Sequence, residues 1–317
     1  MSNTFGTRFR LTAYGESHGH AIGGVVDGCP SGIIFDTVLL ASEMQRRHVG
    51  TGATPRHESD EVEILSGIYD GKTLGTPIAF TIRNRDVRNE DYASIAEFYR
   101  PGHADYTYQC RYGRRDPRGG GRASGRETAV RVVGGAIAKM VLQQCGIAVN
   151  ATLVESHTPA ENDSVGGVIK CVIDNAPAGI GDPVFGKLNA RLAAAMMSIP
   201  SATGFEMGAG FEASRMAGSQ YRDDWAADGS FRTETNNCGG IQGGISNGMP
   251  IEFRVAFHPA TTVNQPTNCI DSEGIIHTVT PSGRHDRNHL DRTVVVVEAM
   301  AAMTIADYYP FNHQNSK

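Results

Sequence analysis

The chain has 317 residues, of which 38 are glycines, and its length leaves room for a buried small-molecule site. Its formal net charge of −5 shows no surplus of positive charge. This balance argues against a nonspecific nucleic-acid binder, so any anion site has to be local. Six scattered cysteines without zinc-ligand spacing, and apolar stretches interrupted by charges, argue against a metal centre, a disulfide framework and a membrane span, so we expect a cytoplasmic protein.

The first half of the chain predicts alternating strands and helices. A strand and a Pro-x-Gly turn fall within 23–33, a helical pattern covers 43–47, and apolar residues alternate with a period of two over 78–82, as in a strand. A longer helix is predicted over 122–144, after a glycine run. Long polar loops, which are where binding sites are often built, are expected at 83–118, 215–237 and 258–284.

The second half repeats this order and ends on another helix. A strand and turn are expected within 166–180, a helix over 187–197, a strand over 251–255 and the last helix over 291–308. The mixture predicts a layered fold of the α+β class.

An internal repeat indicates that the halves are related. Residues 65–82 align without gaps with residues 238–255 at a constant offset of 173, and seven positions are identical. The identical positions include Pro77 with Pro250. We therefore expect one domain over 1–317 with an internal duplication of about 7–84 and 147–257.

Two histidines follow glycine-containing turns and are candidates for proton transfer. Ser17 and His18 lie in YGESHGHAIGG over 14–24, and His103 follows a Pro-Gly pair in YRPGHADY over 99–106. Imidazole titrates near neutrality, which suits a general acid or base. A histidine in such a turn is more often a hydrogen-bonded structural residue, so both interpretations stay open.

The segment RYGRRDPRGGGRASGR over 111–126 contains six arginines. A solvated basic loop and a disordered, nucleic-acid-binding RGG tract are two interpretations. We favour an anion site, because the glycines lead into an apolar helix whose free N–H groups and dipole suit phosphate.

A second segment, GRHD over 283–286, also precedes a helix, and its Asp286 is either a helix cap or a general base.

Together, these segments resemble the signature motifs of chorismate synthases over almost the whole chain. The matching segments, in family order, are GESHG (15–19), RR (46–47), VEILSG (62–67), GTPI (75–78), RPGHADY (100–106), RGGGRASGRET (118–128), SNGMPI (246–251) and RHD (284–286).

The resemblance implies a fold and an activity. The fold is a β-α-β sandwich of two pseudo-symmetric halves, usually a homotetramer. The activity is the anti-1,4-elimination of phosphate from 5-enolpyruvylshikimate-3-phosphate to give chorismate. It requires reduced FMN without net redox change, NADPH is a candidate reductant, and no nucleic acid or membrane partner is implied.

The resemblance also implies roles for individual residues. His18 would protonate the departing phosphate, His103 would manage the proton on reduced flavin, and Asp286 would help to remove the C6 proton. Ser17 and Ser124 would orient the partners. The residues implied in FMN binding are Arg122, Ala123, Ser124, Pro200, Ser201, Gly243, His258, Pro259, Ala260, Thr261, Thr262 and Arg284. The positive charges of Arg284 and a protonated His103 would favour binding of the reduced flavin over the oxidised flavin.

Several positions depart from the family pattern. Arg47 matches an arginine implied in substrate or NADP binding, but a second arginine is replaced near Ala53, and Arg56 is its expected substitute. His258 stands where a lysine is common, which makes this contact sensitive to pH, and Arg287 follows the RHD motif in place of proline. The segment over 155–165 is also short.

Two other functions remain as alternatives. An NAD(P)H-dependent flavin oxidoreductase is disfavoured, because no G-x-G-x-x-G follows a predicted strand. A noncatalytic flavin- or anion-binding homologue is supported only by the departures from the family pattern at Ala53, His258 and Arg287. The catalytic interpretation rests on the joint presence of Ser17, His18, His103, Ser124 and Asp286.

Overall fold

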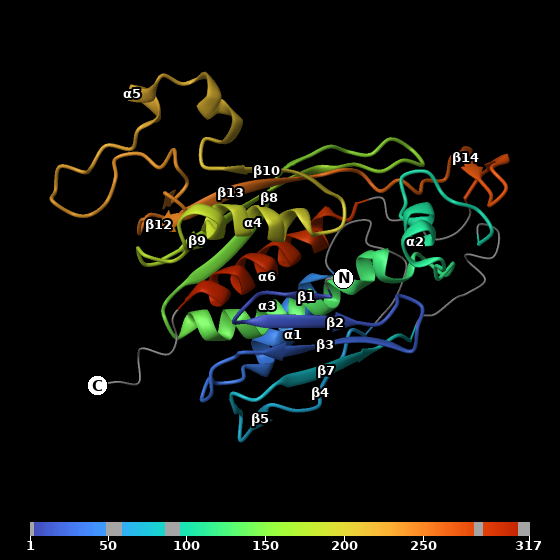
Figure 1. Cartoon of the computed structure of the whole chain (residues 1–317), viewed down its shortest axis with the longest axis horizontal. Coiled ribbons are helices and arrows are strands. Elements are labelled where there is room, and N and C mark those ends of the chain that lie inside the picture. The colour runs from blue at the N-terminus through green and yellow to red at the C-terminus, as the bar shows by residue number, and fades with distance from the viewer. Residues whose placement is uncertain (1–2, 49–58, 86–95, 282–287, 310–317) are drawn as a thin grey trace.

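Two antiparallel sheets enclose a layer of helices in the computed structural model, which describes residues 3–48, 59–85, 96–281 and 288–309 (Figure 1). The first sheet has the order β1 (Thr4–Phe5), β2 (Arg10–Tyr14), β3 (Ala21–Asp27), β7 (Ile78–Arg83) and β4 (Val62–Ile64). The second has the order β10 (Ala202–Met207), β13 (Ile251–Phe257), β9 (Gly167–Asp174) and β8 (Ala148–Ser156). The architecture is an α+β sandwich.

The helical layer consists of α1 (Thr37–Arg46), α3 (Thr128–Gln143), α4 (Leu188–Met197) and α6 (Leu290–Tyr308). At the centre, α3 packs against α6, while α1 packs on α3 and α4 packs on α6. Both central helices are apolar on nearly all faces, which is expected of helices covered on every side. The two helices predicted over 122–144 and 291–308 are therefore confirmed, although two short 3₁₀ turns, η2 (Gly121–Ala123) and η3 (Gly125–Glu127), precede α3.

The two sheets repeat one strand order, β2-β3-β7-β4 in the first and β8-β9-β13-β10 in the second. Each half of the chain also contains a short separate hairpin, β5–β6 (Ile68–Tyr69 and Lys72–Thr73) in the first and β11–β12 (Ile241–Gln242 and Ile245–Ser246) in the second.

Equivalent hydroxyls in the two hairpins make the same bonds. Thr73 Oγ1 donates to Pro30 O at 2.6 Å and accepts from Ile33 N, while Ser246 Oγ donates to Pro177 O at 2.6 Å and accepts from Ile180 N. Thr73 and Ser246 are 173 positions apart, the offset of the sequence repeat. These correspondences support an internal duplication, which we keep as a proposal.

The expected long loops contain structure of their own. Helix α2 (Asp105–Tyr112) lies in the first, α5 (Gly218–Tyr221) in the second, and the hairpin β14–β15 (Thr267–Ile270 and Ile276–Val279) in the third. Within the residues that the structure describes, no helix combines the length and the apolar character needed to cross a bilayer.

Candidate active site

A cavity of about 1880 Å³ lies where the N-terminal ends of α3 and α6 meet α2 and the motif-bearing loops. Of its described lining residues, nine are arginines and five are aspartates or glutamates. This surplus of positive charge suits an anionic ligand. The predicted site residues that line the cavity are His18, Arg47, His103, Arg122, Ala123, Ser124, Pro200, Ser201, His258, Ala260, Thr261 and Thr262.

The loop that carries His18 packs against the glycine run of the arginine-rich segment. Ser17 N donates to Gly121 O at 3.3 Å, and Ser17 Oγ donates to Gly119 O at 3.4 Å. Asn84, just past β7, holds the other side of the loop through Nδ2, which donates to Glu16 O and Gly19 O. His18 is consequently buried at the cavity wall.

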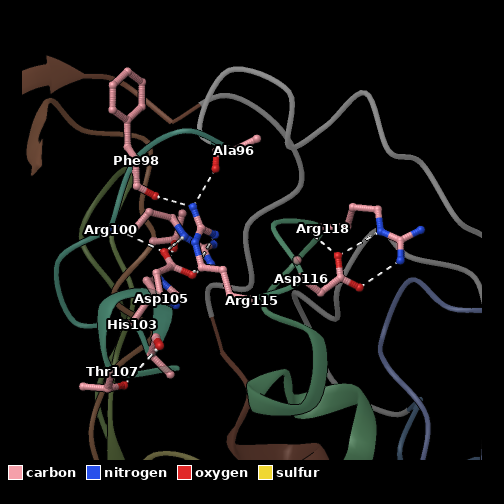
Figure 2. A network of polar contacts seen from close by, with 12 residues as sticks. Ala96, Phe98, Arg100, His103, Asp105, Thr107, Arg115, Asp116 and Arg118 are labelled. Atoms are coloured by element: carbon pink, nitrogen blue, oxygen red, sulfur yellow. Dashed lines mark hydrogen bonds and ion pairs between the residues drawn. The ribbon is translucent and has the colours of Figure 1, made fainter. Parts of the chain in front are cut away.

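The loop that carries His103 is held by a buried carboxylate, which Figure 2 shows. Asp105 accepts from Arg100 N, Nε and Nη2 at 2.8–3.1 Å, and Arg115 Nη1 lies 3.5 Å from the same side chain. On the other side, Thr261 Oγ1 donates to Gly102 O, and His103 Nε2 is hydrogen-bonded to Thr262 Oγ1. The loop thus joins the 258–262 segment across a long sequence separation.

The surroundings of His103 favour its neutral form. Burial and the positive charge of Arg100 lower the pKa of His103 to about 4. In the ligand-free protein His103 is therefore neutral at neutral pH, and the expectation of a protonated His103 beside reduced FMN stays a prediction for the ligand-bound site. The cause is that a buried imidazole beside a guanidinium loses the solvation that would stabilise its charge.

Some arginines of the arginine-rich segment that line the cavity are paired within the protein, and others have no carboxylate partner among the residues that the structure describes. Arg115 donates to Ala96 O at 2.6 Å and Phe98 O at 2.9 Å and stacks on the Tyr99 ring, so it holds the chain together (Figure 2). Arg118 pairs with Asp116. In the described part of the chain, Arg114 and Arg122 line the cavity without a carboxylate partner.

On another wall of the cavity, the carboxylate of Asp60 pairs with several basic side chains. Arg47 Nη1 lies 2.9 Å from Asp60 Oδ2, and Arg126 Nη1 is paired with Asp60 Oδ1. Burial would raise the pKa of Asp60, but His48, Arg47 and Arg126 outweigh it and lower that pKa well below its usual range. Nearby, burial and the charge of Arg47 lower the pKa of Arg292 to about 10, so Arg292 remains a cation at neutral pH.

Three predicted residues do not line this cavity. Ser17 and Pro259 are adjacent to residues that do, whereas Gly243 lies in the β11–β12 hairpin, on the side of the molecule away from α2 (Figure 1). The predicted residues Arg56, Arg284 and Asp286, and the departures at Ala53 and Arg287, lie outside the described residues.

Sequence reasoning missed several residues of the site. Asp60 and Asn84 carry no motif signal on their own, and Arg292 and His289 lie at the start of the last predicted helix, just after the GRHD segment that was singled out. The signal available for Arg292 was a lone arginine at the start of an apolar helical run. Among the described residues, no cluster of three His, Cys, Asp or Glu side chains is placed to hold a metal ion.

Comparisons with known proteins agree on one family. The family model described as chorismate synthase matches residues 9–159 and 156–309. The chorismate synthase of Cytophaga hutchinsonii is 47% identical, with 98% of each chain covered, and that of Synechocystis is 44% identical, with 97% of each chain covered. A crystal structure of a chorismate synthase superposes with a TM-score of 0.75 at 30% identity, and the match covers 96% of this chain and 92% of that chain. The chain therefore belongs to the chorismate synthase family.

Proposed function

We propose that this cavity eliminates phosphate from 5-enolpyruvylshikimate-3-phosphate to form chorismate, with reduced FMN bound beside the substrate. Family membership makes the chain a lyase of aromatic amino-acid biosynthesis. The observation that carries the proposal is that His18 and His103, from loops far apart in the sequence, line one arginine-rich cavity. Two imidazoles beside a basic anion site suit a reaction that loses phosphate and moves protons.

The residues present fit a flat, phosphorylated cofactor. Gly119, Gly120 and Gly121 all have positive φ, between 55° and 85°, so the backbone can come close to a ligand. Arg122 stands beside this run, and Ser124 and Thr262 offer hydroxyls. These groups, with Ala123, Pro200, Ser201 and the 258–261 segment, would hold FMN, which in its reduced form supplies transient electron density to the substrate.

The side chains of this chain would move the protons and hold the charge. His18, buried beside Asp116, is the proposed proton donor to the departing phosphate. His103 is the proposed proton-holding group near the cofactor, with Thr262 fixing its Nε2. An anionic ligand would raise the pKa of His103, because an opposite charge favours the protonated imidazole. Arg47 and Arg292 are the proposed cations for the substrate's anionic groups.

The proposal extends to the parts of the site and assembly that family membership supports in general terms. Asp286 is the proposed base for the C6 proton, and Arg284 remains a proposed FMN contact, whereas Gly243, which lies outside the cavity, is not proposed as one. Arg56 remains a proposed substitute for the arginine replaced near Ala53. A cytoplasmic homotetramer is proposed as well, and NADPH stays a candidate reductant of FMN.

The direct test is chorismate formation from the named substrate without oxygen, with chemically reduced FMN. Product formation that depends on both protein and reduced FMN supports the proposal. Tight binding of FMN or substrate without any product would instead favour a noncatalytic homologue.

A further inference from the structure

Ser201, in the cavity wall, has a backbone conformation that serine rarely adopts. Ala202 N donates to Ile199 O at 3.1 Å and closes a turn whose central residues are Pro200 and Ser201. Ser201 has a φ of 68°. Proline followed by a residue of positive φ is typical of a type II turn, in which glycine usually takes the second of these positions. A serine there is strained, and such strain persists only where the surroundings hold it.

Three hydrogen bonds hold Ser201. Its hydroxyl donates to Pro200 O at 2.5 Å, its carbonyl accepts from His258 N at 2.9 Å, and its Oγ lies 2.8 Å from His289 Nε2. His289 is the residue that precedes α6, so this last bond ties the start of β10 to the start of α6. Pro200, Ser201, His258 and His289 all line the cavity.

The hydrogen count assigns the direction of the Ser201–His289 bond. A hydroxyl carries one proton, and Ser201 directs it to Pro200 O, so His289 donates through Nε2. Burial, followed by the charge of His258, lowers the pKa of His289 to about 4, so the donor is a neutral imidazole with its proton on Nε2. The ring is thereby fixed in one orientation.

We propose that His289 is a positioning residue that acts through the Ser201 hydroxyl to hold the Pro200–Ser201 turn in the ligand-binding wall of the cavity. A glycine at position 201 would remove the strain but also the hydroxyl, and with it the link to α6. The serine is therefore used because its hydroxyl is needed. That the ligand at this wall is FMN rests on the proposed function.

A double-mutant cycle tests the proposal. The variants are His289→Ala, Ser201→Gly and the two combined, and the readouts are FMN affinity, from flavin fluorescence with the substrate present, and urea unfolding of the ligand-free protein. Each single change should weaken FMN binding about tenfold, as for residues that share one contact, and the double variant should be no weaker than either single one. His289→Gln, whose amide can still donate, should recover most of the affinity. His157→Ala, an exposed histidine outside the cavity, is the matched control and should bind FMN normally.

Losses that add in the double variant would overturn the proposal, because His289 would then act independently of Ser201. Unchanged FMN affinity in His289→Ala would also overturn it, even if unfolding couples the two residues, since their role would be only structural. Neither readout depends on turnover. A failure of the proposed function, with no chorismate formed, is therefore distinguishable from a failure of this inference.

Discussion

Lys139 Nζ on α3 lies 2.5 Å from Glu298 Oε2 on α6, inside the helical layer. The same lysine lies 2.6 Å from Glu43 on α1, and Glu298 also accepts from Arg46 and from Ala151 N on β8. One buried cluster thus connects α1, α3, α6 and the second sheet. Because Arg47 directly follows Arg46, the cluster also anchors the helix end that brings Arg47 to the cavity.

Removal of Lys139 should cost much stability. Lys139→Met leaves the carboxylates of Glu43 and Glu298 close together in the interior, and breaking a buried pair in this way costs about 3–5 kcal/mol. Urea unfolding measures this loss. Lys170→Met is the matched control, because Lys170 pairs with Glu252 at 2.6 Å on a partly exposed sheet face, where the expected loss is about 0–1 kcal/mol. Equal losses in the two variants would contradict the assignment of a buried cluster.

The two proton-transfer histidines should affect turnover more than binding. His18→Ala or His103→Ala should lower kcat by roughly 10²–10⁴, while FMN affinity changes little, because general acid–base groups act mainly in the transition state. Steady-state kinetics with chemically reduced FMN checks this, and His157→Ala serves as the control. Near-normal turnover in either variant at saturating substrate would return that histidine to a structural role.

Asn84 should be needed to position the His18 loop. Its Nδ2 holds Glu16 O and Gly19 O, and its Oδ1 accepts from Arg126 Nε at 3.1 Å. Asn84→Ala removes all three bonds, and we expect kcat to fall about tenfold or more, since a small misplacement of a catalytic group is costly. Asn84→Asp, which keeps the acceptor for Arg126 but not the donors, separates the two effects. Unchanged kcat in both variants would exclude a positioning role for Asn84.

Stability should fall as the pH drops from about 6.5 to about 4. The pKa of both His103 and His289 is lowered from 6.5 to about 4 in the folded protein. The unfolded chain therefore binds more protons in this window, so acidification favours unfolding by up to about 1.4 kcal/mol per pH unit for each histidine. The lowered pKa of Asp105 acts in a separate window, below its ordinary value of 3.8.

Urea unfolding at about pH 7 and about pH 5 measures this effect. His289→Gln cannot take up the proton, so its stability should change less between the two conditions than that of the unmodified protein. An identical change in both proteins would show that His289 does not contribute to the pH dependence.

Periodicity predicted the central helices well, because α3 and α6 are long and apolar, but it did not predict α2. That helix is short, its N-cap residue Ala104 makes no side-chain bond, and its sequence is mostly polar. Its position depends instead on Asp105 and the arginines around it.

Motifs pointed to His18, His103 and Ser124 as site residues. They could not show which of the arginines pair with carboxylates inside the protein and which do not. The carboxylate that pairs with Arg126 is that of Asp60, 66 positions away, and only the fold brings the two together. The neutral state of His103 could not be predicted either, because it depends on burial and on Arg100 in the folded loop.

The most direct test of the central claim is the stoichiometry of an oxygen-free reaction with much less reduced FMN than substrate. Chorismate, phosphate and the redox state of the flavin are followed together. The account predicts equal amounts of chorismate and phosphate, many turnovers per flavin, and flavin that is still reduced at the end. One flavin oxidised for each product formed would contradict it and indicate an oxidoreductase.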